Sequence, residues 1–305
     1  MINTETLSKE AQILFLGGGS EIGTELSIRL SLEGYHLIEG TTSGTKLEAI
    51  RRRIFEADGI RPRGFVADLT NPDQVRKAYG ALNLEPDTPV HLLLWSVASM
   101  SLAMRMAIGK EAASAYKPNG KTIDEATQGI RSIVRAEGAL NDLMRVNTGM
   151  LDIVNLLKRD GHLTKDSVVS TLSSSGSDAL KNPNDPDSYP GPWLYYPIAY
   201  PKQSLVLSLQ EEAQKAGFRY INFVAPLVED TPIVDWFGKL IARLKERYPG
   251  MIFDLPSMTK TDLVTTLSNR LMHVENGEQI ENVYIKGLNE VSPTRPPEWN
   301  KQYPF

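Results

Sequence analysis

Short apolar runs alternate with amphipathic segments from near the start of the chain. Segment 11–16 (AQILFL) is an apolar run that ends in glycines, as a buried strand does, and 21–33 follows with Ile22, Leu26 and Leu30 at helical spacing. Further apolar runs predict strands at 36–39, 64–67, 90–94, 168–172, 220–224 and 282–285, and 46–57 predicts another helix. Alternating strands and helices indicate an α/β fold. We therefore expect a doubly wound, mostly parallel sheet of about seven strands with helices on both faces.

Composition narrows the class of protein. The 305 residues are 41% hydrophobic and 23% charged, enough for one sizeable core, so we expect a single domain over 1–305. A net charge of -4 without a basic stripe disfavours nucleic acid and anionic membranes as partners. The absence of cysteine excludes disulfides and thiol chemistry, and the four histidines lack metal-ligand spacing, so no metal is expected. No apolar run is long enough to span a bilayer, and the polar start does not fit a signal peptide, which favours a cytoplasmic protein.

A glycine-rich segment, 17–23 (GGGSEIG), separates the first predicted strand from the first predicted helix. Glycines there let the backbone approach a pyrophosphate, which the positive end of the following helix attracts. A plain strand-to-helix turn would show similar glycines, so the pattern gains weight only from its context. The expected dinucleotide contacts are Gly17, Gly19, Ser20, Glu21, Ile22 and Gly23.

The segment after the second predicted strand, 41–43 (TTS), suggests which dinucleotide is bound. An NAD site usually places a carboxylate there to accept from the ribose 2′-hydroxyl, whereas small hydroxylated residues leave room for a 2′-phosphate. The sequence therefore favours NADP(H) as the cofactor. Its expected ligands are Thr41, Thr42 and Ser43, with Lys46 or Arg51 supplying positive charge. Glu39, just before this segment, is the argument for NAD.

Two further segments resemble those of the short-chain dehydrogenases/reductases. Asp68 and Leu69 follow the third predicted strand, where the family has an aspartate that accepts from the adenine amino group. Segment 221–231 (INFVAPLVEDT) is similar to a family motif whose threonine meets the nicotinamide carboxamide, although Leu227 replaces its usual glycine. The resemblance, from about 12 to about 288, implies a Rossmann fold. It also implies cofactor contacts at Ser96, Val97, Ala98, Lys202, Pro226, Val228 and Thr231.

The resemblance also implies catalytic residues. In this family a tyrosine protonates the substrate oxygen, a lysine lowers the tyrosine pKa, a serine shares the oxyanion and an asparagine keeps a water relay in place. The lysine corresponds to Lys202 and the asparagine to Asn147, although Asn147 could instead cap or kink its helix. The serine corresponds to Ser173 in VVSTLSSSG, with Ser174 in reserve.

The tyrosine departs from the family's usual Y-x-x-x-K spacing. Tyr195 stands seven residues before Lys202, which is two helical turns and the same helical face. This spacing is similar to that of the enoyl-acyl-carrier-protein reductases. Prolines at 197 and 201 argue against a regular helix through the stretch, so Tyr196 is the alternative acid.

Three segments are expected to shape the substrate site or the assembly: an insertion at about 99–145, a substrate lid at about 232–257 and an extended C-terminal tail at 290–305. The expected activity is hydride transfer from NADPH to a carbonyl of a bulky or acyl-type small molecule. The alternatives are reduction of an enoyl thioester carried on CoA or acyl carrier protein, and a non-catalytic NADP(H)-binding regulator. Family members usually pair through the helices that carry the asparagine and the lysine, which predicts a homodimer or homotetramer.

Overall fold

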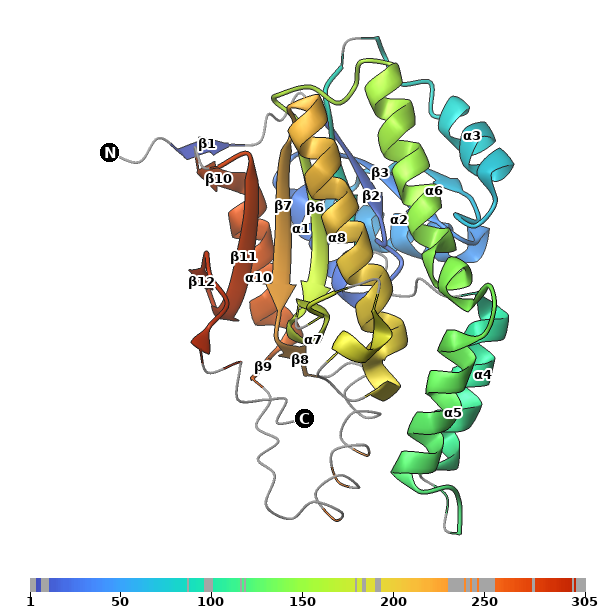
Figure 1. The fold of residues 1–305 in the computed structure, drawn as a ribbon. Coiled ribbons are helices and arrows are strands. Elements are labelled where there is room, and N and C mark those ends of the chain that lie inside the picture. The colour runs from blue at the N-terminus through green and yellow to red at the C-terminus, as the bar shows by residue number, and fades with distance from the viewer. Residues whose placement is uncertain are drawn as a thin grey trace.

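The computed structural model describes residues 4–6, 11–86, 88–95, 101–115, 117, 119–178, 180–182, 185–189, 193–229, 239, 242, 246, 256–275, 278–297 and 299. Its centre is an eight-stranded sheet in the order β12-β11-β7-β6-β5-β2-β3-β4 (Figure 1). The strands are β2 (Gln12–Leu16), β3 (His36–Thr41), β4 (Arg63–Val66), β5 (Val90–Leu94), β6 (Val168–Ser174), β7 (Arg219–Ala225), β11 (Ile280–Gly287) and β12 (Glu290–Ser292). Neighbouring strands in this sheet are parallel except β11 and β12. The expected doubly wound fold is confirmed, and β12 is the strand that the sequence did not predict.

Two short strand pairs lie outside the main sheet. One joins β1 (Thr4–Thr6) to β10 (His273–Glu275) in antiparallel register. The other joins β8 (Leu227–Val228) to β9 (Ser257–Met258) in parallel register. The second pair extends the chain just beyond the carboxyl end of β7, close to where the predicted lid begins. Most of the predicted lid, 232–257, lies outside the described residues.

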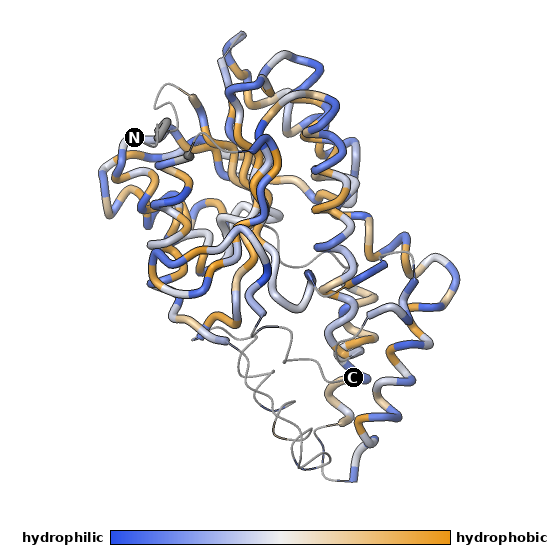
Figure 2. The backbone as a smooth tube through the Cα atoms, turned by 60° about the vertical axis from the view of Figure 1, so that its left-hand side comes forward, coloured by the Kyte–Doolittle hydropathy of each residue, from blue (hydrophilic) through white to orange (hydrophobic). Residues whose placement is uncertain are grey.

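Helices cover both faces of the sheet, because successive residues of each strand point to opposite sides. On β2, Leu14 and Leu16 join the core under α3 (Pro72–Gly80), α6 (Ala139–Arg159) and α8 (Tyr196–Ala216). Ile13 and Phe15 join the core under α1 (Glu21–Leu32), α2 (Gly44–Asp58) and α10 (Lys260–Met272). Hydrophobic residues are concentrated along the central strands, whereas the helices alternate in hydropathy (Figure 2).

Helix α8 runs without interruption through both prolines, contrary to the expectation of an irregular stretch. Pro197 lies in the first turn, where the missing N–H has no intrahelical partner in any case. Pro201 lacks the N–H that would donate to the Pro197 carbonyl, so α8 loses one hydrogen bond near its start. The stretch before α8 is the short 3₁₀ turn η2 (Trp193–Tyr195). Tyr195 therefore stands at the N-cap of α8 rather than inside it.

The predicted insertion forms a helical hairpin at one end of α6 (Figure 1). It consists of α4 (Leu102–Ser114) and α5 (Ile123–Arg135), and a capping box between Thr122 and Glu125 starts α5. Buried side chains of the hairpin, such as Met104 and Ile130, share one apolar cluster with Trp193 and Tyr196. The hairpin thus packs against the segment that carries the candidate tyrosines.

The described part of the C-terminal tail lies against the body of the molecule. Trp299 is buried and its ring meets that of Tyr284 edge-on at 5.8 Å. Arg295 donates hydrogen bonds to the Ser175 carbonyl at 3.0 Å and to Asp178 at 2.8 Å, both in α7 (Ser175–Asp178). The tail therefore contacts the turn that follows β6. Among the described helices, none is long and apolar enough to cross a bilayer.

Candidate functional site

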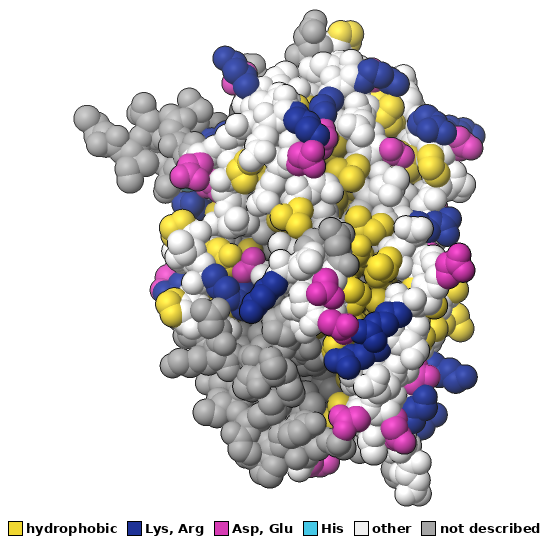
Figure 3. Space-filling model, in the orientation of Figure 1, with side chains coloured by type: hydrophobic (Ala, Val, Ile, Leu, Met, Phe, Trp, Pro, Cys, Tyr) yellow, Lys and Arg dark blue, Asp and Glu magenta, His cyan; other side chains and the backbone are white. Residues whose placement is uncertain are grey.

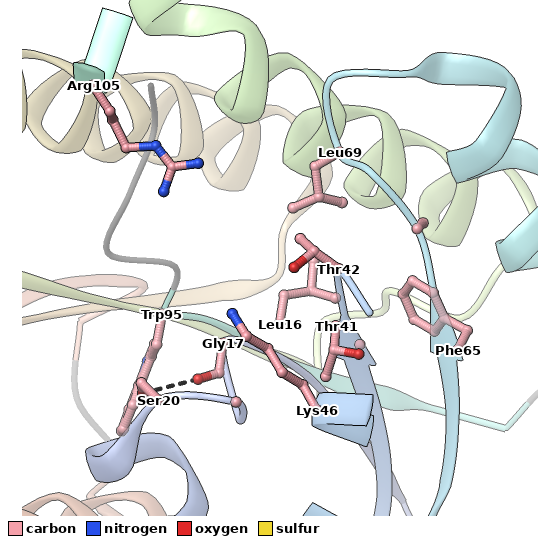
Figure 4. Close-up of a pocket in the computed structure, with 13 residues that line it drawn as sticks. Leu16, Gly17, Ser20, Thr41, Thr42, Lys46, Phe65, Leu69, Trp95 and Arg105 are labelled. Carbon is pink, nitrogen blue, oxygen red and sulfur yellow. Dashed lines mark hydrogen bonds between the residues drawn. The ribbon is translucent and has the colours of Figure 1, made fainter. Parts of the chain in front are cut away.

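A cavity of about 320 Å³ opens at the carboxyl ends of β2, β3, β4 and β5 (Figure 4). Chain order reverses between β2 and β5, and ligands of open α/β sheets bind in the crevice at such a switch point. The glycine turn and the end of β3 form one part of its wall, through Gly17, Gly19, Ser20, Thr41 and Thr42. Leu16, Phe65, Ala67 and Leu69 form an apolar part, and Lys46, Trp95 and Arg105 complete it.

The glycine turn is held in one conformation by its own hydrogen bonds. The Ser20 hydroxyl donates to the Gly17 carbonyl and accepts from the Gly23 amide, both at 3.0 Å, and so caps α1. Gly17 has φ 124°, a conformation that favours glycine. A Cβ atom at Gly23 would overlap the Gly17 carbonyl, so Gly23 lets α1 approach the turn.

Gly19 differs from its neighbours because none of the described residues requires a glycine there. A Cβ atom added at Gly19 would come no closer than 3.7 Å to any other side chain, which is ordinary van der Waals contact. The residue lines the cavity, however, so its bare backbone leaves the cavity open beside the N-terminus of α1. A surface of this kind suits a ligand whose phosphate approaches the main chain closely.

Helix α1 carries an acidic residue, Glu21, in its first turn, where its carboxylate would repel an anion. The carboxylate forms an ion pair with Lys260 of α10 at 3.2 Å, which offsets this repulsion. Neither Glu21 nor Ile22 lines the cavity. Ile22 packs instead against the core under α1. Both were expected to contact the cofactor, and the structure places them beside the turn rather than in the cavity.

The three hydroxyl residues at the end of β3 that were expected to bind a 2′-phosphate differ in their hydrogen bonds. The Thr41 hydroxyl donates to the Ser43 carbonyl at 2.9 Å, and the Ser43 hydroxyl accepts from the Lys46 amide at 3.3 Å as the cap of α2. Thr42 is exposed and lines the cavity, and its hydroxyl makes no hydrogen bond within the described residues. Thr42 is therefore the hydroxyl free to meet a ligand.

The positive charge in the cavity near β3 comes from Lys46. Lys46 lines the cavity and has no ion pair within the described part of the chain (Figure 4). Arg51, the other candidate, pairs with Glu48 at 2.8 Å and donates to the Pro62 carbonyl at 3.1 Å. Arg51 does not line the cavity. Of the two cations that the sequence left open, Lys46 is the one that lines the cavity.

Glu39 points beneath the glycine turn and not into the cavity. Its side chain is fully buried, accepts a hydrogen bond from Ser27 of α1 at 2.6 Å and leaves its second oxygen without a partner. A Cβ atom at Gly18 would overlap this carboxyl group, so Gly18 is needed for the two to pack together. Burial raises the pKa of Glu39 to about 7. In this position Glu39 cannot accept from a ribose hydroxyl in the cavity, which removes the argument for NAD.

Leu69 lines the expected adenine side of the cavity, whereas Asp68 does not. Asp68 is exposed, and one carboxylate oxygen accepts from the amide and hydroxyl of Thr70 at 2.9 and 2.8 Å. The backbone of Leu69 rests on α6 at Gly149, where an added Cβ atom would overlap the Leu69 carbonyl. The predicted contact of Asp68 with adenine stays a prediction.

Tyr195 and Ser174, both candidate catalytic residues, lie next to each other. Their hydroxyl groups are hydrogen-bonded, and Ser174 also contacts the Ser177 hydroxyl at 3.0 Å. Tyr195 is buried, and desolvation raises the pKa of its hydroxyl. The raised pKa keeps the phenol protonated, so Tyr195 has a proton to donate, and a nearby positive charge would be needed to lower that pKa for acid catalysis.

Ser173, the first choice from the sequence, points elsewhere. Its hydroxyl donates to the Asn222 side chain at 2.9 Å and to the Phe223 carbonyl at 3.3 Å, both on β7. Ser173 and Ser174 are consecutive on β6, so their side chains lie on opposite faces of the strand. The pairing of Ser173 with the tyrosine is therefore corrected: Ser174, the reserve, holds that position.

Tyr196 belongs to an aromatic cluster and not to the hydroxyl pair. Its ring stacks on Trp193 at 4.7 Å and on Tyr200 at 5.6 Å between ring centres. The residue is fully buried, and its hydroxyl has no hydrogen-bond partner among the described residues. Burial raises its pKa. The structure thus separates the two candidate tyrosines, with only Tyr195 next to the serines of β6 and α7.

Asn147 contacts the start of α8 at the residue next to Lys202. Asn147 of α6 is fully buried and its amide donates to the Pro201 carbonyl at 2.7 Å, next to Lys202, while its carbonyl oxygen has no partner. Lys202 is partly buried and has no ion pair within the described residues, and desolvation lowers its pKa to about 8. Asn147 thus fixes the backbone that carries the lysine rather than capping α6.

The remaining predicted contacts fall into two groups. Pro226 is buried after β7, and Val228 packs on the core under α1 and α10; neither lines the cavity. Ser96, Val97, Ala98 and Thr231 lie outside the described residues. The charged cavity residue that sequence reasoning missed is Arg105, because its helix belongs to the insertion and nothing in the local pattern shows where that insertion folds. The described residues contain no cluster of His, Asp or Glu suited to a metal ion.

Comparison with known proteins identifies the fold. No protein-family model and no curated protein matches the sequence. Solved structures do match: an alcohol dehydrogenase from the archaeon Thermococcus sibiricus in complex with 5-hydroxy-NADP shares 14% identity over 94% of this chain and 99% of that chain, with a TM-score of 0.55. An NADPH-bound short chain oxidoreductase from Pseudomonas aeruginosa PAO1, with an atypical catalytic center, shares 15% identity over 92% and 97%, with a TM-score of 0.58.

A variant of actinorhodin polyketide ketoreductase with NADPH shares 15% identity over 92% of this chain and 97% of that chain, with a TM-score of 0.56. At such identities the likeness concerns the fold. The chain therefore shares the fold of these oxidoreductases, the Rossmann fold that the sequence resemblance implied.

Proposed function

We propose that this protein is an NADP(H)-dependent reductase that acts on the carbonyl group of a small molecule. The observation that carries the proposal is the cavity at the switch point. It presents the bare backbone of Gly19, the hydroxyl of Thr42 and the unpaired cation of Lys46, while Glu39 is turned away beneath it. These residues fit a dinucleotide with a 2′-phosphate better than one with a free 2′-hydroxyl.

When bound, the nicotinamide would supply a hydride to the carbonyl carbon. Tyr195 would donate its hydroxyl proton to the carbonyl oxygen, which yields the alcohol, and would regain a proton from solvent. Ser174, already hydrogen-bonded to Tyr195, would share the developing negative charge on that oxygen. The cationic form of Lys202 would stabilise the tyrosinate, and Asn147 would keep Lys202 in place through the Pro201 carbonyl.

The structural neighbours support the same chemistry. They include the ketoreductase described above and a levodione reductase, which shares 16% identity over 91% of this chain and 96% of that chain, with a TM-score of 0.57. A bulky or acyl-type substrate is our finer proposal. It is supported by the helical hairpin beside Tyr195, which adds a further wall to this side of the molecule.

A titration of the purified protein with NADPH and with NADH tests the cofactor. Trp95 lines the cavity and gives a fluorescence signal for binding. We expect tighter binding of NADPH, and we expect Lys46→Ala to weaken NADPH binding about tenfold or more while changing NADH binding little, since a hydrogen bond to a charged group contributes about 1.5–3 kcal/mol. Arg51→Ala is the matched control on the same helix. Equal affinities of wild type for both cofactors would contradict the proposed NADP(H) preference.

Reduction of an enoyl thioester is the second candidate, because the acid is Tyr195, seven residues before Lys202. In that reaction the tyrosine would protonate an enolate. A panel of ketones and crotonyl thioesters, followed by NADPH absorbance, separates the two activities. Tight NADPH binding without turnover of any panel member would favour a non-catalytic NADP(H)-binding regulator.

We also propose that the protein forms a homodimer or homotetramer in the cytoplasm, through α6 and α8. Hydrophobic side chains gather over these helices on the face shown in Figure 3. Leu207 of α8 is 42% exposed. Light scattering during size-exclusion chromatography measures the assembly. Leu207→Glu is expected to lower the molecular mass to that of one chain, and a wild-type mass of one chain would contradict the proposal.

A further inference from the structure

We propose that Arg105, in the first turns of α4, binds a phosphate group of the cofactor, which makes the helical hairpin part of the cofactor site. The proposal rests on the proposed function, since it assumes a phosphorylated dinucleotide in the cavity. It goes beyond that function because it assigns a binding role to the insertion, a segment that the family resemblance leaves without one.

The first argument is position. Arg105 lines the same cavity as the glycine turn and Lys46, although it is 59 residues further along the chain than Lys46. Figure 4 shows the guanidinium group directed into the cavity from α4, across from the end of β3 that carries Thr42. A residue far away in the sequence thus completes the wall opposite the predicted phosphate ligands.

The second argument is that Arg105 has no partner among the described residues. It makes no hydrogen bond and no ion pair with any described residue, and its side chain is exposed. Other arginines of this region are engaged: Arg131 lies over the Trp193 ring at 4.8 Å, Arg135 pairs with Asp187, and Arg145 lies 3.6 Å from Asp142. Arg105 therefore differs from its neighbours in having its charge directed at the open cavity.

The third argument is charge balance. Lys46 and Arg105 are the two charged residues among the described residues that line the cavity, and no carboxylate lines it. Two cations that face one cavity without a counter-ion repel each other, so they favour an anion between them. NADP(H) carries a diphosphate and a 2′-phosphate, and the planar guanidinium group binds a phosphate through two parallel hydrogen bonds.

The hairpin is anchored well enough to present this arginine. Met104, next to Arg105, is buried in the apolar cluster that contains Trp193 and Tyr196. The Ser101 hydroxyl caps α4 and is hydrogen-bonded to Asp142 of α6. Because the same hairpin packs on the segment that leads to Tyr195, a phosphate bound by Arg105 would tie the cofactor to the wall of the substrate site.

The test compares NADPH and NADH affinities of wild type, Arg105→Ala and Arg105→Lys in the full chain, by tryptophan fluorescence. We expect Arg105→Ala to weaken NADPH binding about tenfold or more and Arg105→Lys to weaken it less, because lysine keeps the charge but loses the paired hydrogen bonds. Lys110→Ala is the matched control, since Lys110 is an exposed cation of α4 that does not line the cavity. Its affinity should equal that of wild type.

The NADH measurements show which phosphate is bound. A loss of affinity for both cofactors assigns Arg105 to the diphosphate, and a loss for NADPH alone assigns it to the 2′-phosphate; either supports the inference. If wild type binds NADPH and Arg105→Ala binds it equally well, the inference is overturned while the proposed function stands. If wild type binds neither cofactor, both are overturned. Since Arg105 is exposed and unpaired, its replacement should leave the thermal unfolding midpoint unchanged, which separates lost binding from lost folding.

Discussion

The hydroxyl groups of Ser174 and Tyr195 are hydrogen-bonded to each other, although the two residues are 21 positions apart in the chain. Ser174 ends β6 and Tyr195 ends η2, so the contact joins the sheet to the start of α8. It is the one place in the described structure where a candidate acid and a candidate oxyanion donor meet. The first two predictions concern these residues.

Tyr195→Phe is expected to lower kcat for carbonyl reduction by 100-fold or more, in line with the roughly 10²–10⁴-fold contribution of a positioned general acid. NADPH affinity should stay unchanged, because Tyr195 does not line the cofactor cavity. Tyr196→Phe is the matched control and should keep kcat within a few-fold. Tyr196→Phe should also unfold at an equal or higher denaturant concentration than wild type, because it removes a buried hydroxyl that has no partner among the described residues. A kcat loss in Tyr196→Phe alone would reverse our assignment.

Ser174→Ala and Ser173→Ala should separate activity from stability. Ser174→Ala is expected to reduce kcat about 100-fold, because it removes the hydroxyl that contacts Tyr195. Ser173→Ala should leave kcat almost unchanged and should lower stability by about 1–2 kcal/mol, because Asn222 loses a buried hydrogen-bond donor. Steady-state kinetics and urea unfolding of both variants measure the two effects. The opposite pattern would restore Ser173 as the catalytic serine.

Lys202 predicts a decline of activity in alkaline solution. Desolvation lowers its pKa to about 8, so its positive charge is lost as the pH rises through that value. We expect kcat to fall above about pH 8 and Lys202→Arg to move this fall to higher pH, since an arginine stays charged. A pH profile in which wild type and Lys202→Arg decline together would show that another group limits the rate.

Lys202 should lower the stability of the folded protein at neutral pH. A lysine whose pKa is lowered by folding destabilises the protein while it is protonated, so the cost is complete below about pH 8 and disappears as the pH approaches 10.5. Lys202→Met, which is inactive under the proposal, is therefore expected to be more stable than wild type at pH 7, by up to about 3 kcal/mol. Urea unfolding at pH 7 and near pH 10.5 measures the difference, and an equal gain at both pH values would contradict the lowered pKa.

Glu39 should make stability depend on pH in the acidic range. Its folded pKa is raised from 4.5 to about 7, so between these values the folded protein keeps a proton that the unfolded chain loses. Wild-type stability should therefore fall as the pH rises from 4.5 to about 7, by up to about 3 kcal/mol, and stay level above. Glu39→Gln should lack this fall. Glu56→Gln, which changes an exposed carboxylate of α2, is the control and should follow wild type.

Gly149 should matter for the cofactor although it does not touch it. Gly149→Ala forces the Leu69 backbone away from α6, and Leu69 lines the cavity. We expect a loss of 1–3 kcal/mol in stability, as is typical of overpacking, together with weaker binding of both NADPH and NADH. Gly109→Ala in α4 is the control, because an added Cβ atom there meets nothing within 4 Å. Unchanged stability in Gly149→Ala would show that the loop after β4 yields without cost.

The sequence by itself determined the architecture and predicted where a cofactor would bind. The seven predicted strands and the glycine turn are local features, because an apolar run, a period of 3.6 residues and a glycine at φ 124° are each set by neighbouring residues. The spacing of Lys202 from the tyrosines also came from the sequence, which left Tyr195 and Tyr196 as alternative acids. The length of the segment at about 99–145 also predicted the insertion, but the sequence did not show what the insertion does.

Only the tertiary structure decided which side chains meet. The sequence favoured Ser173 over Ser174, but the packing of β6 between its neighbours turns Ser174 toward Tyr195 and Ser173 toward β7. Glu39 stands next to the hydroxylated segment in the chain, yet the approach of α1 draws its carboxyl group under Gly18 and out of the cavity. Arg105 reaches the cavity because the hairpin packs on the aromatic cluster around Trp193, a contact between segments far apart in the chain. Such contacts depend on long-range packing, which no local pattern of residues records.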